Sequence, residues 1–359
     1  MSSIGELNLE NYDSTLVTIC TVIYISIVGF GAITVSLFIA VLIKGHSLFK
    51  EFPFFTIVWH LTIVNGISVI LQITCVVPSM FFDYNDEDKW AKWYSLGISV
   101  VNLTETATST LVFLIALNRF SVFVFRPLAW AFTRDHIKYP LLIGWVFILI
   151  VSYLRLFQMT AVTKFIRKTF EFHDVFLVNE GPIFLFVVSS SYVIPAAIFL
   201  MYIIIYMFLQ KKRASLSTLS DDNNNSNNDK SLLLQGFLLA ISIMIWRTLF
   251  TLTPRVRATG WVKYMMVLLK ALSSVLNNIL NPILFFTTNQ TVRKVLKNLL
   301  TCQSMEPKVL SESEAGQSVS RQRFRIKNPI QKIKMKKNTV VVEPIVILSN
   351  MDQLPKVDN

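Results

Sequence analysis

The sequence predicts an all-α membrane protein, built as a bundle of seven membrane-spanning helices. The chain of 359 residues is 53% hydrophobic and only 16% charged, whereas charged residues make up about a quarter of an ordinary globular domain. Seven long apolar stretches follow one another, and a helix of about 20 such residues spans a bilayer because it satisfies its own backbone polar groups. The predicted spans are residues 14–43, 52–82, 93–125, 139–159, 181–210, 231–252 and 264–288.

Four of these spans contain an uninterrupted apolar run, which begins at Ala271 in the seventh span. The other three each carry one charged residue inside the run: Glu105 in the third, Arg155 in the fourth and Arg247 in the sixth. A count of six or eight would require one of these charged spans to fail, or residues 253–264 to insert separately. We therefore expect seven spans.

The distribution of positive charge predicts the orientation, because cytoplasmic loops carry an excess of Lys and Arg. Most of the 34 Lys and Arg residues fall in the inner loops and the tail if the N-terminus lies outside, and residues 1–13 contain none. We therefore predict an extracellular N-terminus at residues 1–13 and a cytoplasmic C-terminus. The opposite topology, which insect odorant-receptor channels have, would place the basic run from Arg321 to Lys337 outside.

After the seventh span, the sequence predicts a short helix on the membrane surface, followed by a tail. Valines and leucines within residues 289–300 recur at helical spacing opposite three cations, which indicates a short amphipathic eighth helix on the inner membrane face. Cys302 follows it, and a palmitoyl group there would reach lipid directly, with an unmodified thiol as the alternative. Residues 303–359 predict a disordered basic cytoplasmic tail that lies either on anionic lipid or in solvent.

The net charge of +12 could indicate nucleic acid as a partner. The basic residues, however, fall in short loops beside the spans and in one tail, as membrane topology requires, so no nucleic-acid binding is expected. The polar run Asp221 to Asp229 cannot form a core and predicts a linker between the fifth and sixth spans.

The sequence offers no catalytic or metal-binding pattern. It has no phosphate-cradling glycine loop, no His and Cys at zinc spacing, and only four histidines, so we predict a protein that is no enzyme and needs no cofactor or metal. The three cysteines and the N-glycosylation sequons lie within spans or inside, so neither an outer disulfide nor a glycan is expected. We expect His60 to form a hydrogen bond between two helices; the alternative is that it lines a pocket.

Ionisable groups inside the spans are the candidate ligand-binding residues, because a charge at the centre of a bilayer is costly. Glu105 lies about 21 Å from Arg119 at 1.5 Å per residue, and Arg247 and Lys270 reach a similar depth in the outer half of their spans. The three side chains therefore either bind a ligand or pair with one another. Arg155 lies nearer the edge and is expected to extend to the outer headgroups.

Two motifs resemble those of rhodopsin-like G-protein-coupled receptors. The triplet Asn118-Arg119-Phe120 resembles the Asp-Arg-Tyr of that family, and Asn281-Pro282-Ile283-Leu284-Phe285 resembles its Asn-Pro-x-x-Tyr. Trp145 and Pro195 stand where that fold places such residues in the fourth and fifth spans. The resemblance covers about residues 14–302.

The flank of the triplet resembles the nematode serpentine chemoreceptors of the Srx or Srv type, since Ala116-Leu117-Asn118-Arg119-Phe120 is followed by Phe125-Arg126-Pro127. This resemblance implies a small extracellular ligand, odorant-like or a short peptide, and a heterotrimeric G protein as partners. It implies a location in the plasma membrane, with a sensory cilium as one such place. In the same family, the Asn118-Arg119-Phe120 triplet would couple to the G protein, and the activation switch would comprise Pro195, Asn281, Pro282 and Phe285.

The departures from the family pattern carry expectations of their own. Asn118 stands where an acid normally pairs with the arginine, so Arg119 is expected to be loosely restrained at rest. Asn65 replaces the aspartate of the family's sodium site, so sodium regulation is not expected. Trp246 and Pro254 are too far apart to form the family's Cys-Trp-x-Pro motif.

Two other classes of membrane protein compete with the receptor. A transporter or channel would be favoured by internal repeats and broken helices at the midplane, and the two halves of this chain show no such similarity. A retinal pigment would need a lysine near the middle of the seventh span, whereas Lys270 lies about 18 Å outward of Pro282. The sequence makes no prediction of the oligomeric state.

Overall fold

The computed structural model describes residues 14–81, 89–166, 171–176, 181–216, 223–253 and 260–301. The chain divides into two units, Met1–Gln303 and Ser304–Asn359, and the second lies wholly outside the described residues. The predicted extracellular segment 1–13, the lipidation candidate Cys302 and the predicted basic tail 303–359 also lie outside them.

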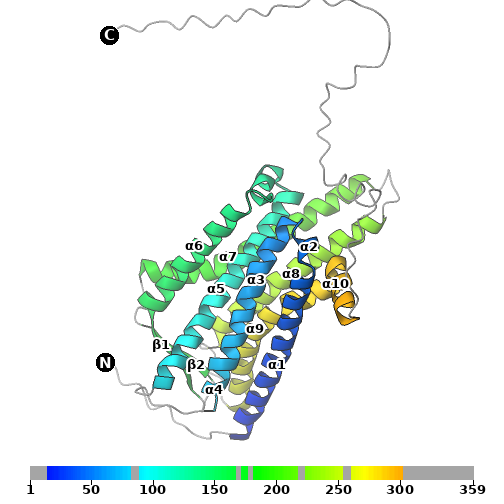
Figure 1. The fold of residues 1–359 in the computed structure, drawn as a ribbon. Coiled ribbons are helices and arrows are strands. Elements are labelled where there is room, and N and C mark those ends of the chain that lie inside the picture. The colour runs from blue at the N-terminus through cyan, green and yellow to red at the C-terminus, as the bar shows by residue number, and fades with distance from the viewer. Residues whose placement is uncertain are drawn as a thin grey trace, which may run out of the picture. The chain divides into compact units, whose positions relative to one another are not determined.

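Seven long helices run alongside one another in the described part of the chain (Figure 1). They are α1 (Ser14–Lys44), α3 (Pro53–Leu71), α5 (Lys89–Phe123), α6 (Lys138–Tyr153), α7 (Pro182–Leu216), α8 (Asn223–Leu252) and α9 (Gly260–Thr288). The three shorter α-helices are α2 (His46–Phe49), α4 (Val77–Ser79) and α10 (Gln290–Leu300).

Six of the helical segments are long and apolar enough to cross a membrane, namely α1, α3 through α4, α5, α6, α7 and α9. This makes the protein a membrane-embedded helical protein, as the composition predicts. In α8 the corresponding apolar part of the described chain, Gln235–Leu249, is shorter. The sixth predicted span, residues 231–252, and with it the total of seven, therefore stays a prediction.

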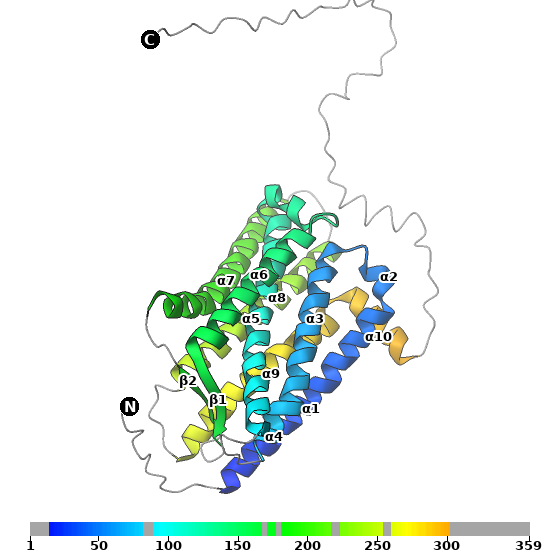
Figure 2. The same ribbon diagram turned by 60° about the vertical axis from the view of Figure 1, so that its left-hand side comes forward.

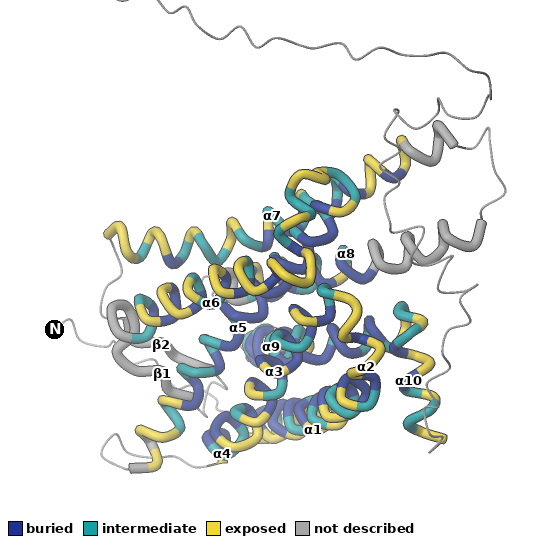
Figure 3. Tube along the Cα trace, turned by 45° about the horizontal axis from the view of Figure 1, so that its top comes forward, coloured by how far each residue is buried: buried dark blue, intermediate teal, exposed yellow. Residues whose placement is uncertain are grey.

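Helices α1, α6 and α7 each present an exposed face on the outside of the bundle (Figure 3), and large aliphatic side chains lie on these faces while several amides are buried inside. Ile33 of α1 and Ile143 of α6 are 69% and 70% exposed, while Asn65 of α3 and Gln235 of α8 are each 1% exposed. A soluble protein would not leave many large aliphatic side chains in water and bury amides instead. The pattern fits helices that face hydrocarbon.

Three segments depart from α-helical winding. Two are π-helical, η1 (Gln72–Val76) at the end of α3 and η3 (Leu154–Met159) at the end of α6. The third, η2 (Arg126–Phe132), is a 3-10 helix between α5 and α6. A π-turn holds an extra residue, so the side chains after it point in different directions from those that an α-helical wheel predicts.

A β-hairpin connects α6 to α7, and the all-α prediction missed it. Strand β1 (Thr160–Ile166) pairs antiparallel with β2 (Glu171–Phe176), with Thr163 opposite Asp174. Both views place it at the same end of the bundle as α4 (Figure 2). The β-branched and aromatic residues of Thr160–Ile166 were the signal, since such residues favour strands.

The prediction of a linker over Asp221 to Asp229 is wrong from Asn223 onward, where α8 begins. Helix formation is costly only at its first turn, and each further residue adds a hydrogen bond to a helix that already exists. The apolar part of α8 supplies that helix, and asparagine in a helix interior costs only a few tenths of a kcal/mol relative to alanine.

Helix α5 occupies the centre of the bundle, where it contacts α3, α6, α7 and α8. Its middle carries a run of small hydroxyl residues, among them Thr106 and Thr110, and small side chains let neighbouring helices approach closely. Thr110 Oγ1 donates to the Thr106 carbonyl oxygen at 2.9 Å, so the hydroxyl is satisfied within its own helix. Helix α9 contacts α1, α3 and α8 on the other side.

Gly31 marks a close approach between α1 and α9, and we predict that Gly31→Val destabilises the bundle. A Cβ at Gly31 would lie 3.0 Å from both Cγ1 and Cδ1 of Ile279, whereas one at Gly29 would meet nothing within 4 Å. Overpacking typically costs about 1–3 kcal/mol. The apparent melting temperature of the purified protein in detergent should fall for Gly31→Val and stay near the wild-type value for Gly29→Val. Equal losses in the two variants would mean that valine in α1, rather than the contact with Ile279, is responsible.

Candidate functional site

Glu105 is the centre of a charged cluster inside the bundle. Its Oε1 accepts a hydrogen bond of 2.6 Å from Ser274 Oγ, which joins α5 to α9. Tyr24 of α1, which is buried, lies within electrostatic reach of the same carboxylate. Neither Ser274 nor Tyr24 was predicted as a partner of Glu105, because a single serine or tyrosine is common in an apolar span.

Arg247 brings α8 into this cluster. Its side chain is only 6% exposed, and its Cζ lies 4.0 Å from the centre of the neighbouring Trp246 ring. Glu105, Arg155 and Tyr192 all act electrostatically on its guanidinium. An aromatic face and a nearby carboxylate are two of the environments that stabilise a desolvated cation.

Lys270 is likewise buried, at 9% exposure, and lies one helical turn before Ser274 on α9. The three sequence-predicted residues therefore lie on α5, α8 and α9. Glu105 is within electrostatic reach of Arg247, and it bonds to the serine one turn from Lys270. We call Glu105, Arg155, Arg247, Lys270 and Ser274 the Glu105 cluster. Both signs of charge are present in it.

The expectation that Arg155 extends to the outer headgroups is wrong. The side chain is only 9% exposed and acts electrostatically on Arg247 inside the bundle. Arg155 lies at the start of the π-helix η3. The expectation rested on its place near the edge of the span, which does not determine whether a side chain points out of the bundle or into it.

A set of buried amides and hydroxyls continues from the Glu105 cluster along α3, α5 and α9. Asn278, one turn after Ser274, donates from Nδ2 to Ser68 Oγ at 2.9 Å. Asn65 donates to the Asn278 carbonyl oxygen at 3.4 Å and accepts a hydrogen bond of 3.3 Å from Thr108 Oγ1. Asn65 is thus part of a network of neutral groups that ties three helices together.

Arg119 lies toward the opposite end of α5 from Glu105 and is enclosed there. Its exposure is 7%. Its Nη1 donates to Tyr202 Oη at 3.4 Å and its Nη2 donates to Gln235 Oε1 at 3.3 Å. Its Cζ also lies 5.4 Å from the centre of the Phe54 ring. The expectation of a loosely restrained arginine is wrong, because these contacts fix it to α7, α8 and α3.

Two routes connect Arg119 to α9, and both depend on residues that sequence reasoning missed. Phe54 lies between Arg119 and Phe285, with its ring centre 6.1 Å from that of Phe285. Gln235, which accepts from Arg119, also accepts a hydrogen bond of 3.4 Å from Thr288 Oγ1. The two motifs singled out in the sequence are therefore in indirect contact.

Tyr202 is held against α8 by a glycine. A Cβ at Gly236 would overlap the ring and hydroxyl of Tyr202, so only glycine at this position leaves room for the tyrosine that accepts from Arg119. Gly236 follows Gln235 directly, which places both α8 contributions to the Arg119 site on adjacent residues.

The remaining predicted residues lie near this end of the bundle or in the helices that lead to it. Asn118 is buried and Phe120 half-buried on α5, and Pro195 is buried inside α7. Asn281 is 1% exposed, and its side-chain oxygen and nitrogen make no hydrogen bond with the described residues. Pro282 follows it inside α9, and Phe285 stacks on Phe38 of α1 with ring centres 5.4 Å apart.

His60 fulfils both of its predicted roles. Trp145 Nε1 on α6 donates to His60 Nδ1 on α3 at 3.3 Å, which is the predicted hydrogen bond between helices. His60 also lines a pocket formed by α2, the first turns of α3 and the turn that precedes α6.

The described residues contain no group of three or more His, Cys, Asp or Glu side chains that could hold a metal ion. No protein-family model matches the chain, and no curated protein matches its sequence. The likeness to receptors therefore rests on the residues quoted above.

We predict that Glu105 and Arg247 stabilise the fold jointly. Glu105→Gln or Arg247→Gln alone leaves the opposite charge buried, which typically costs about 3–5 kcal/mol. The double variant should lose less stability than the sum of the two single losses. Melting temperatures in detergent measure this.

The matched control combines Glu105→Gln with Arg119→Gln. These positions are about 21 Å apart along α5, so their effects should add. Additive losses in the Glu105 and Arg247 pair as well would mean that the two charges do not stabilise each other.

Proposed function

We propose that this protein is a seven-transmembrane receptor of the chemosensory type, which binds a small extracellular ligand and activates a heterotrimeric G protein. One observation carries the proposal: a buried cation, Arg119, joins four helices near the C-terminal end of α5, about 21 Å along that helix from the buried charged cluster. Its direct contacts reach α3, α7 and α8, and Phe285 and Thr288 extend them to α9.

The Glu105 cluster is the proposed ligand site. It holds a carboxylate, three cations and a hydroxyl, supplied by α5, η3, α8 and α9. A small polar or amphipathic ligand that carries either sign of charge, or a short peptide, finds a complementary partner there. Such a ligand would compete with Arg247 for Glu105, and the helices that carry these residues would shift relative to each other.

The Arg119 end is the proposed G-protein site. Outward movement of α8 separates Gln235 from Arg119, because this bond joins α8 to the central helix. The freed guanidinium is then available to a helix of the G-protein α-subunit. The ligand shifts the equilibrium only by the difference in its affinity for the two arrangements.

The proposal includes the predicted topology. The N-terminus is extracellular, α8 forms the sixth of the seven spans, and the Arg119 end faces the cytoplasm of the plasma membrane. Helix α10 then lies on the inner membrane face as the eighth helix. Its Val292 and Val295 are buried while Arg293, Lys294 and Lys297 are exposed.

Signalling in a heterologous cell tests the coupling role of Arg119. The chain is expressed with a G-protein reporter and challenged with odorant-like compounds and short peptides. Arg119→Ala should abolish the response at equal surface expression, because the cation that contacts the G protein is gone. Lys92→Ala, which removes an exposed cation from the same helix, should leave it intact. A responding receptor that signals fully without Arg119 would contradict the proposal.

Basal activity tests the role of the residue before Arg119. We expect Asn118→Asp to lower ligand-free signalling, because a carboxylate beside the guanidinium strengthens the resting arrangement. Asn118→Gln keeps a neutral amide and is the control. If ligand-free signalling is the same in the wild type and in Asn118→Asp, the neutral side chain at position 118 does not raise the basal activity of the receptor.

A further inference from the structure

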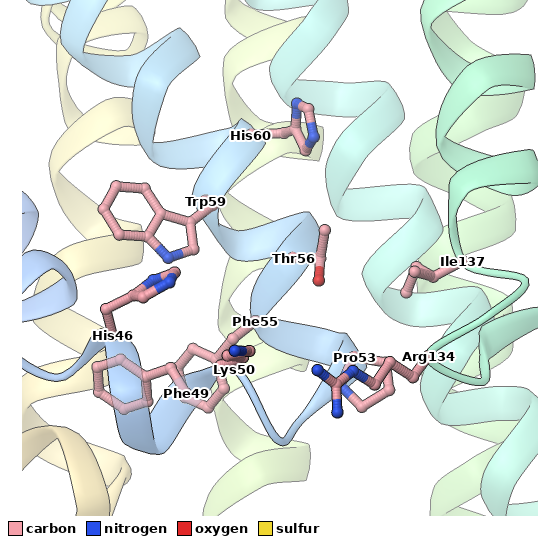
Figure 4. Close-up of a pocket in the computed structure, with 10 residues that line it drawn as sticks. All are labelled: His46, Phe49, Lys50, Pro53, Phe55, Thr56, Trp59, His60, Arg134 and Ile137. Carbon is pink, nitrogen blue, oxygen red and sulfur yellow. The ribbon is translucent and has the colours of Figure 1, made fainter.

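A pocket of about 540 Å³ lies at the Arg119 end, between the start of α3 and the turn that precedes α6. Its size falls within the range of small-molecule sites, which is about 300–1,000 Å³. Figure 4 shows Arg134 extending from that turn toward Pro53, with the Thr56 hydroxyl pointing to the same side. The pocket lies far from the Glu105 cluster and is not part of the proposed ligand site.

The lining of this pocket is rich in hydrogen-bond donors and contains no acid. Lys50 and Arg134 contribute exposed cations, and His46, Thr56 and Trp59 can each donate a hydrogen bond. None of the lining residues is Asp or Glu; Glu51 and Asp135, the acidic neighbours of the two cations in the sequence, do not line it. Such a set of groups fits an anion.

His60 adds a further donor at the inner wall. Because its Nδ1 accepts the hydrogen bond from Trp145, the neutral ring carries its own proton on Nε2. The histidine is thereby fixed in one tautomer by a contact outside the pocket.

The other walls of the pocket are apolar. They are formed by the side chains of Phe49, Trp59 and Ile137. Helix α3 begins at Pro53 and α6 at Lys138, so the cations lie where spanning helices meet the headgroup layer. Farther along the same helices Ile63 and Leu142 are exposed on the bundle surface, where acyl chains can lie.

We propose that this pocket binds the phosphorylated headgroup of an anionic membrane lipid. Arg134 can bind two oxygens of one phosphate group, Lys50 adds a point charge, and Thr56 and His60 can donate to the remaining oxygens. A phosphoinositide meets these requirements, since it offers a phosphate monoester at the level of the cations and acyl chains at the level of Ile63 and Leu142. In the proposed orientation the pocket faces the cytoplasmic leaflet, which holds the anionic lipids.

Binding of a fluorescent phosphatidylinositol phosphate to the full chain in phosphatidylcholine nanodiscs tests the proposal. The double variant Lys50→Gln with Arg134→Gln should bind at least about ten-fold more weakly, because it removes both cations that bind the phosphate group directly in the proposed site. The control pair Arg126→Gln with Lys138→Gln removes two exposed cations from the same region outside the pocket. It should bind as wild type does.

A filling variant separates a pocket from diffuse surface charge. Thr56→Trp places a bulky side chain in the pocket and leaves every charge unchanged, so lipid binding should fall while the melting temperature stays near that of the wild type. Binding that survives Thr56→Trp, or that the control pair weakens as much as the pocket pair does, would overturn the proposal. Equal affinity for the soluble inositol phosphate and the lipid would overturn the assignment to a lipid.

Discussion

The constraint on which the rest of this structure depends is the cost of placing charge inside an apolar bundle. A charged side chain at the centre of a bilayer costs roughly 2.5–3.5 kcal/mol even on insertion scales. The protein meets this cost in two ways. Glu105 and Arg247 carry opposite charges within electrostatic reach of each other, Arg247 beside the Trp246 ring and Glu105 bonded to Ser274. At Arg119, neutral groups from three neighbouring helices surround one cation.

Both solutions require α5 to stand in the middle, since Glu105 and Arg119 lie on the same helix. The small hydroxyl residues between them let the neighbouring helices approach. Asn65, Thr108 and Asn278 fill this region with hydrogen bonds between α3, α5 and α9. Each of these amides is satisfied by a residue from another helix, so the helices cannot slide without breaking polar contacts in an apolar surrounding. Such contacts favour discrete arrangements over continuous deformation.

The Arg119 site and the lipid pocket share an aromatic wall. Phe55 lines the pocket, and its ring centre lies 5.6 Å from that of Phe54 and 6.2 Å from that of Phe285. Phe54 in turn contacts Arg119. A headgroup in the pocket would touch Phe55, whose ring packs against the Phe54 and Phe285 rings that connect Arg119 to α9. If both proposals hold, the lipid on this side of the membrane would bias the arrangement of the G-protein site.

The membrane class and the approximate positions of the long helices could be predicted from the residues alone, because length, apolarity and the scarcity of charge are properties of each segment. The sequence also singled out Glu105, Arg247, Lys270 and Arg119, since an ionisable residue in an apolar run is conspicuous. The partners Ser274, Gln235 and Tyr202 could not be predicted from the sequence, because a single polar residue in a helix does not show which residue of a neighbouring helix it contacts.

The directions of the side chains and the changes in helical winding depend on how the helices pack, so they became visible only in the folded bundle. Arg155 is buried inside the bundle at the start of a π-helical segment, and a place near the end of a span does not reveal that burial. Gly236 has a role only because Tyr202 of another helix occupies the space beside it. The lipid pocket combines Lys50 with Arg134, which are distant in the sequence and are brought together by the packing of α3 near α6. Apolarity is a local property that sequence records directly, whereas pairing between helices depends on a geometry that the whole bundle sets.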